Sequence, residues 1–152
     1  MSQQVTDPFM WKGRRWVFLG ADDVHSLFDP KTYGLNPSPP TTDCWKGFVV
    51  HFCVKHNELF LEKLDVYCHD GVYPKIAGIS PSERIGTDFR RYKNIHQKLV
   101  YSGIITIGRG YLKDYLDRSF TGPHMYKKVY ELHFKNGGLQ NCLNTSDTYS
   151  GF

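Results

Sequence analysis

The 152-residue sequence has few features that would identify a chemistry. Its cysteines form no C-x-x-C pair and are too few for a disulfide framework, which favours reduced thiols in the cytoplasm. These cysteines are Cys44, Cys53, Cys68 and Cys142. No apolar run approaches the length of a membrane span, and the N-terminal residues lack the pattern of a signal peptide. The sequence therefore predicts a cytoplasmic protein without a membrane segment.

Catalytic and cofactor motifs are also missing. There is no G-x-S-x-G nucleophile elbow, and Gly108-Arg109-Gly110 lacks the rest of a phosphate-binding loop. The histidines and cysteines of the central region have none of the usual zinc spacings. These residues are His51, Cys53, His56, Cys68 and His69. We expect no metal and no cofactor, and no catalytic residue follows from a motif.

Charge of one sign is not in large excess either. The 19 Lys and Arg against 15 Asp and Glu give a net charge of +4, which is mild for a general polyanion binder. Aromatic residues, in contrast, are abundant, with ten Phe, ten Tyr and three Trp. Such residues favour strands. The length predicts a single domain, which we place at residues 8–143, with flexible tails at 1–7 and 144–152.

Three segments have the pattern of β-hairpins. The clearest is Gly47–Val66, in which two apolar-rich runs flank a polar turn, and Phe48, Val50, Phe52 and Val54 share one face. A second hairpin turns at Lys12-Gly13, and a third turns at Asn136-Gly137-Gly138.

The remaining elements are predicted from local signals. We expect a short helix within Ala21–Phe28 and a second helix over Pro81–Gln97, which begins with a Ser-Pro-x-Glu motif. Short strands are expected at Val72–Ile76 and Leu99–Ile107. A proline-rich loop is expected at Pro30–Asp43 and a turn at Gly108–Gly110. The fold class predicted is mainly β (α+β), an antiparallel β-sandwich or barrel with one or two short helices.

The main hairpin also supports a family resemblance. Trp45, Gly47 and Phe48 followed by a Leu-Phe-Leu return strand at 59–61 resemble small uncharacterised bacterial or bacteriophage β-rich proteins. Tyr101–Gly108 is similar to a second element of that pattern. The resemblance implies a bacterial or phage origin and no particular activity.

One segment combines cations with aromatic rings. Between residues 84 and 98, the cations and rings that we select as partner-binding residues are Arg84, Arg90, Arg91, Tyr92 and Lys93, with His96 as the alternative acid or base. Cations neutralise phosphates and aromatic faces stack on bases, so this mixture is typical of nucleotide or RNA sites. On a helix, however, Phe89, Tyr92 and Ile95 would form a buried stripe and the cations its solvated face.

Two functions remain open from the sequence. The first is a non-catalytic binding or inhibitor module, similar to immunity proteins or phage inhibitors, that occludes a protein partner with its aromatic surface. The second is a nucleotide- or RNA-binding protein, including a phosphodiester-cleaving enzyme that uses the basic segment. We favour the first, since no catalytic signature is present.

Overall fold

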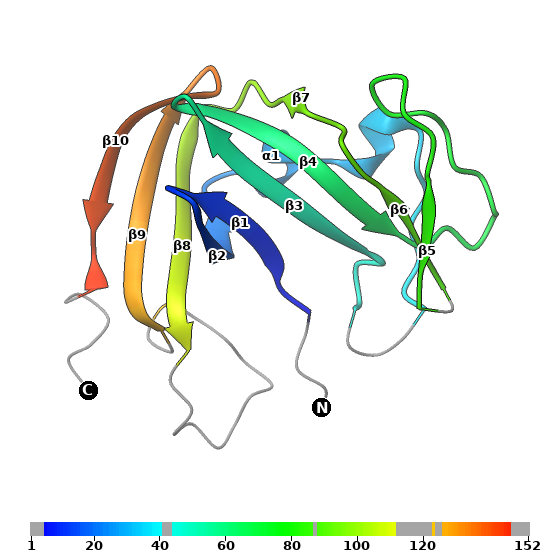
Figure 1. Cartoon of the computed structure of the whole chain (residues 1–152), viewed down its shortest axis with the longest axis horizontal. Helices are drawn as coiled ribbons and strands as arrows, with labels where there is room; N and C mark the ends of the chain where they lie inside the picture. Colours follow the sequence, from blue (N-terminus) through cyan, green and yellow to red (C-terminus); the bar gives the residue numbers. More distant parts are fainter. Residues whose placement is uncertain (1–4, 41–43, 87, 112–122, 124–125, 147–152) are drawn as a thin grey trace.

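The structure is a computed structural model that describes residues 5–40, 44–86, 88–111, 123 and 126–146. Strands dominate this part of the chain (Figure 1). They are β1 (Asp7–Trp11), β2 (Arg14–Ala21), β3 (Phe48–Lys55), β4 (Glu58–Val66), β5 (Glu83–Ile85), β6 (Phe89–Tyr92), β7 (Gln97–Lys98), β8 (Gly103–Tyr111), β9 (Tyr126–Lys135) and β10 (Gly138–Asn144). The short helix α1 (Val24–Leu27) and a 3₁₀ turn, η1 (Pro30–Tyr33), follow β2. The predicted mainly β class is confirmed.

All strands belong to one strongly curled sheet in the order β10-β9-β8-β2-β1-β3-β4-β6-β5, with β7 also paired to β4. Neighbours are antiparallel except β1 and β3, which run in parallel with Phe9 opposite Phe52. The sheet closes on itself at one corner, where Gly138 of β10 lies opposite Glu58 of β4. There the Leu139 amide donates to the Asn57 carbonyl at 2.7 Å. The result is a partly closed barrel (Figure 1).

The three predicted hairpins are confirmed as β1–β2, β3–β4 and β9–β10. Each turns through two residues with positive φ, which are Lys12 and Gly13, His56 and Asn57, and Asn136 and Gly137. Two successive left-handed residues match the twist of the flanking strands. At Gly137 a side chain is also excluded, because a Cβ there would meet the carbonyl oxygen of Leu99.

The inner face of the curled sheet holds the main core. Val50 and Phe52 are buried there as predicted, and Phe48 and Val54 pack against them. A bulge in β4 leaves Glu62 as an extra residue, since His51 pairs with Lys63 and Phe52 with Leu61. Leu61 and Leu64 therefore both face the core although they are three residues apart. The bulge places Glu62 and Lys63 toward the outer face.

The helix predicted over Pro81–Gln97 is wrong. This segment forms β5, β6 and β7 instead. Gly86, Asn94 and His96 have φ values of +66°, +56° and +49°, which no helix accommodates. Strands β6 and β7 pair with the edge of β4 that lies opposite β3. These tertiary hydrogen bonds override the local helix signals.

Smaller predictions also need correction. Gly108–Gly110 is not a turn, because β8 continues through it to Tyr111. Val72–Ile76 is no strand, and only Ile76 forms an isolated bridge, with Ile79. The short helix expected within Ala21–Phe28 is confirmed as α1, where the N-cap Asp23 accepts a hydrogen bond from the Ser26 amide at 3.2 Å.

The two ends of the described chain join the sheet. Asp7 belongs to β1 and is buried, where its carboxylate accepts a hydrogen bond from the Val50 amide at 2.8 Å and pairs with Lys46. Beyond β10, the Thr145 amide donates to Val129 at 2.9 Å. Residues 1–4 and 147–152 of the predicted tails lie outside the described part. Among the residues described, no helix is long and apolar enough to cross a membrane.

Candidate binding groove

The structure does not bring the predicted basic segment together into one pocket. Arg84 lies on β5, exposed and opposite Arg90 of β6. Arg90 stacks its guanidinium over the Tyr73 ring at 5.9 Å. Arg91 follows directly on the same strand, so its side chain leaves the opposite face of the sheet. It pairs with Asp65 of β4.

The other predicted residues also have structural partners. Tyr92 is fully buried, its hydroxyl donates to the Pro74 carbonyl at 2.6 Å, and burial raises its pKa to about 12. Lys93 pairs with Glu83 at 2.8 Å. His96 stacks on Phe60, with ring centroids 4.4 Å apart, and its Nδ1 lies 2.7 Å from Glu62. Most of the residues selected from sequence therefore serve the packing of β4, β5 and β6.

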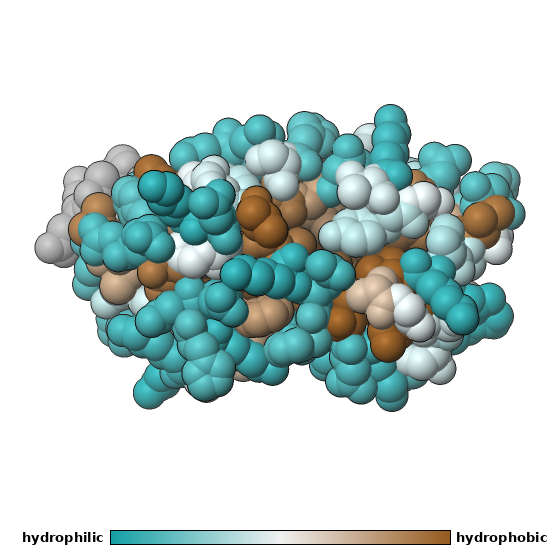
Figure 2. Space-filling view, turned by 90° about the horizontal axis from the view of Figure 1, so that it is seen from above, coloured by the Kyte–Doolittle hydropathy of each residue, from teal (hydrophilic) through white to brown (hydrophobic). Residues whose placement is uncertain are grey.

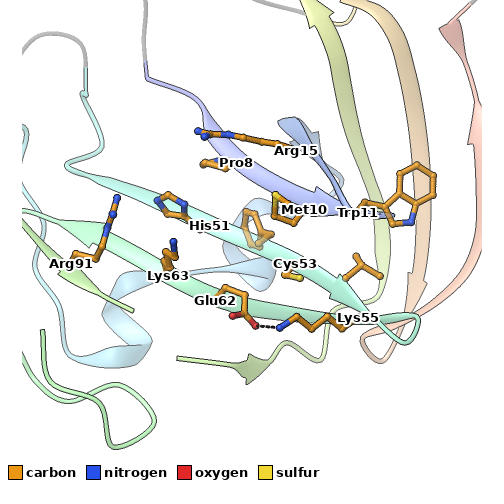
Figure 3. A pocket seen from close by; sticks show the side chains of 13 residues that line it. Pro8, Met10, Trp11, Arg15, His51, Cys53, Lys55, Glu62, Lys63 and Arg91 are labelled. Carbon is orange, nitrogen blue, oxygen red and sulfur yellow. Dashed lines mark ion pairs between the residues drawn. The ribbon is translucent and has the colours of Figure 1, made fainter. Parts of the chain in front are cut away.

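A groove lies on the outer face of the sheet, where β1, β3 and β4 run side by side (Figure 3). Its volume is about 670 Å³, which is in the range of ligand pockets. Of the predicted residues, it contains Arg91 alone. The lining residues are Pro8, Met10, Trp11, Gly13, Arg15, His51, Phe52, Cys53, Val54, Lys55, Glu62, Lys63 and Arg91.

A second hollow continues the groove toward β5 and β6. It shares Pro8, Arg15, His51 and Arg91 with the first and adds the apolar side chains of Val5, Val49, Ile85 and Phe89. Because the two hollows share these walls, they form one elongated depression across six strands, β1 to β6, which we call the outer groove. Seen from above, the molecule shows apolar surface between polar side chains (Figure 2).

The floor of the outer groove is mostly apolar. Met10 is 39% exposed there, beside Pro8 on β1. Cys53 lies opposite Met10 in the parallel β1–β3 pair. Burial raises the pKa of the Cys53 thiol, and neighbouring Glu62 raises it further against the opposing effect of Lys55. A raised pKa keeps the thiol protonated near neutrality, so Cys53 contributes apolar surface and no activated nucleophile.

One wall carries a compact charged cluster. Asp65 is buried, and Arg91 donates to it through two nitrogens, at 2.7 Å and 2.9 Å. The His51 Nε2 lies 3.2 Å from the same carboxylate. Burial would raise the pKa of Asp65, but the hydrogen bonds from Arg91 and His51 together hold it below its ordinary value. The cluster fixes the Arg91 and His51 side chains along the groove.

Two cations of the groove have no such partner. Lys55 lies 3.6 Å from Glu62, but within the described residues neither Arg15 nor Lys63 forms an ion pair. Both are exposed, Arg15 on β2 and Lys63 on β4. They stand on opposite sides of the β1 and β3 floor (Figure 3). The groove thus presents on both rims a cation without an ion pair among the described residues, although Lys63 is attracted at longer range to the Glu83 carboxylate.

The sequence did not reveal this site. Its main residues come from β1, β2, β3 and β4, and they meet because β1 pairs with β3 about forty positions later in the chain. The bulge at Glu62, which turns Lys63 outward, has no sequence signal of its own. The predicted binding residues contribute Arg91 to the groove, and His51 and Cys53 line it from β3.

The predicted histidine and cysteine candidates do not converge. Cys68 is buried in the core, and His56 occupies the hairpin turn. In the described part of the chain, no group of three His, Cys, Asp or Glu side chains could hold a metal ion.

Comparison with protein-family models, curated proteins and solved structures finds no match for this chain. The geometry of the outer groove is therefore the basis for a functional proposal. The resemblance of the main hairpin to small bacterial or bacteriophage proteins stays a prediction.

Proposed function

We propose that the chain is a non-catalytic, cytoplasmic binding module that occludes a partner protein by holding an acidic, partly apolar segment of it in the outer groove. The observation that supports this proposal is the apolar floor between Arg15 and Lys63, two cations that form no ion pair with any described residue. An acidic segment would neutralise both rims, and its apolar side chains would cover Met10 and Pro8. Electrostatic complementarity of this kind selects partners and speeds association.

The polar groups of the groove are arranged for binding rather than for turnover. Asp65 already receives two hydrogen bonds from Arg91 and a contact from His51, so its carboxylate has little capacity left as a general base. The Cys53 thiol is protonated near neutrality because burial raises its pKa. The free thiols of all four cysteines agree with a reducing compartment.

The shape of the groove favours an extended occupant. It runs across strands β2, β1, β3, β4, β6 and β5, and its floor belongs to a hydrogen-bonded sheet that is already formed before binding. A preformed surface loses little conformational entropy on association, so the energy of the contacts appears as affinity. A protein segment that crosses the floor would contact both Arg15 and Lys63.

Selection from a displayed library of random peptides tests the proposal. Peptides of about twelve residues span roughly 40 Å when extended, long enough to cross the groove. We expect the immobilised protein to enrich peptides with Asp or Glu on both sides of an apolar centre. No enrichment above background, or enrichment of basic peptides, would count against the proposal.

A matched pair of variants locates the binding site. Arg15→Glu with Lys63→Glu reverses both rim charges, whereas Arg84→Glu with Lys75→Glu makes the same change at exposed positions outside the groove. The selected peptides should be lost on the first variant and retained on the second. Binding of single-stranded RNA or of a nucleotide that tolerates the first variant but not Arg90→Ala with Arg91→Ala would instead favour the alternative function.

A further inference from the structure

The sheet has two ends, and they differ in how they protect their edge strands. At one end, β5 has only three residues, and two of them, Glu83 and Arg84, are charged. At the other end, β10 has seven residues, and its segment Asn141–Asn144 pairs with β9 on one side and with no other described strand. Charged residues on an edge strand resist pairing with another chain, and an uncharged edge lacks this protection.

β10 is also exceptional in composition. Its sequence, Gly-Leu-Gln-Asn-Cys-Leu-Asn, contains no charged residue and no proline, whereas every other described strand carries at least one charge. Leu143 is 43% exposed on it. An edge strand normally carries charges or proline that prevent association. Among the described strands, the one without a charge is thus an end strand of the sheet, and its segment Asn141–Asn144 pairs on one side alone.

We infer that β10 is a self-association surface, on which a second copy of this chain adds its own β10 antiparallel about a two-fold axis. The inference is independent of the proposed function, because none of the residues lining the outer groove belongs to β10. About a two-fold axis, residue i of one β10 lies opposite residue j of the other and j opposite i, so any charge on the strand would occur twice within the short ladder. Like charges would repel in that arrangement, and β10 has none.

The electrostatics of the neighbouring strand support a second copy as the occupant. β9 carries Lys127, Lys128 and Lys135, and two copies of a chain with net charge +4 repel each other. In a β9-β10-β10-β9 arrangement the two β9 strands are separated by three strand spacings, about 14 Å. This exceeds the Debye length of about 8 Å at physiological ionic strength. The two neutral strands therefore act as a spacer that keeps the lysines of β9 apart.

The local hydrogen bonding is compatible with pairing. The Cys142 amide is satisfied by the side-chain oxygen of Asn141 at 2.9 Å. A backbone carbonyl of an incoming strand would replace the side-chain oxygen of Asn141 as the acceptor for the Cys142 amide. The side chain of Asn141 is exposed and has room to turn away. Leu143 of both copies would then lose water contact within the new ladder, which adds apolar burial to the backbone bonds.

Sedimentation velocity on the full chain from micromolar to millimolar concentration tests the inference. We expect a concentration-dependent shift from the 17.6 kDa monomer to a species of twice that mass. Leu143→Lys should weaken the dimer by about tenfold or more, because it adds a like charge from each copy to the short ladder. A chain that sediments as a monomer at every concentration would overturn the inference.

The control is Val72→Lys, which makes a similar change at an apolar residue that is 53% exposed and far from β10 in sequence. It should change the dimer affinity by less than about twofold. Asn141→Lys replaces Leu143→Lys if circular dichroism shows that the latter is unfolded. A dimer that survives a folded lysine variant of β10 uses another surface, and this result would also contradict the inference.

Discussion

The basic segment at 84–98 and the outer groove both collect cations, but they use them differently. In the basic segment, Lys93 and His96 contact Glu83 and Glu62, and Arg91 contacts Asp65. In the groove, Arg15 and Lys63 have no ion-pair partner among the described residues. Cations that find an acid within the fold support the structure. Arg84 and Arg90 of the basic segment also have no ion pair among the described residues, but they do not line the groove, whereas Arg15 and Lys63 do. Local density of charge in the sequence is therefore a poor guide to the site.

The largest expected effect comes from the structural side of this comparison. Tyr92→Ala removes a fully buried ring and its hydrogen bond to the Pro74 carbonyl. We expect a loss of about 4 kcal/mol in the free energy of unfolding, measured by urea denaturation. If Tyr92 were instead a stacking residue for a ligand, its removal would affect binding and leave stability nearly unchanged.

The charged cluster should show the next largest effect. Asp65→Ala removes the carboxylate that pairs with Arg91 and leaves the Arg91 guanidinium beside a partly buried cavity. We expect a loss of about 3 kcal/mol by the same measurement, since removing one partner of a buried pair leaves the other unpaired. Glu83→Ala, which breaks the exposed pair with Lys93, is the matched control and should leave the urea concentration at the midpoint of unfolding unchanged. Equal effects of the two variants would contradict the distinction.

The pH dependence of stability gives a sharper test of the same cluster. The pKa of Asp65 in the folded protein lies below its ordinary value of 3.8. Its contribution is therefore complete above pH 3.8 and is lost as the pH falls through the lower, folded value. The stability difference between wild type and Asp65→Asn should be constant near neutrality and shrink only in strong acid. A difference that shrinks as the pH falls from 7 to 5 would contradict the lowered pKa.

The smallest expected change in stability is at the groove rims. Arg15→Glu with Lys63→Glu should alter the free energy of unfolding by less than about 0.5 kcal/mol, because both side chains are exposed and form no ion pair in the described part of the chain. Thermal unfolding followed by circular dichroism checks this value. A large destabilisation would mean that these cations also support the fold, and the contrast between the two regions would then disappear.

How much of the fold is predictable from sequence depends on the range of the interaction. The hairpins at Lys12-Gly13, His56-Asn57 and Asn136-Gly137 were predictable because the turn residues and the alternation are local. The parallel β1–β3 pair joins segments about forty residues apart, and no local pattern specifies it. The site depends on that pair, so it could not be predicted.

The segment at 84–98 shows why a local pattern can mislead. Phe89, Tyr92 and Ile95 recur at three-residue spacing, and Tyr92 and Ile95 are indeed buried. They reach the core from a strand and a left-handed turn at Asn94, rather than from a helix. The residue types correctly indicated that these side chains are buried. The three-residue spacing was wrongly interpreted as that of a helix.

Calorimetric titration of a selected acidic peptide tests the central claim most directly. The peptide should bind the wild type and the Arg84→Glu, Lys75→Glu control with dissociation constants within about twofold of each other, and the Arg15→Glu, Lys63→Glu variant at least about tenfold more weakly, a difference of about 1.4 kcal/mol. Unchanged binding to the rim variant, or equal weakening of both variants, would show that the outer groove is not the docking site.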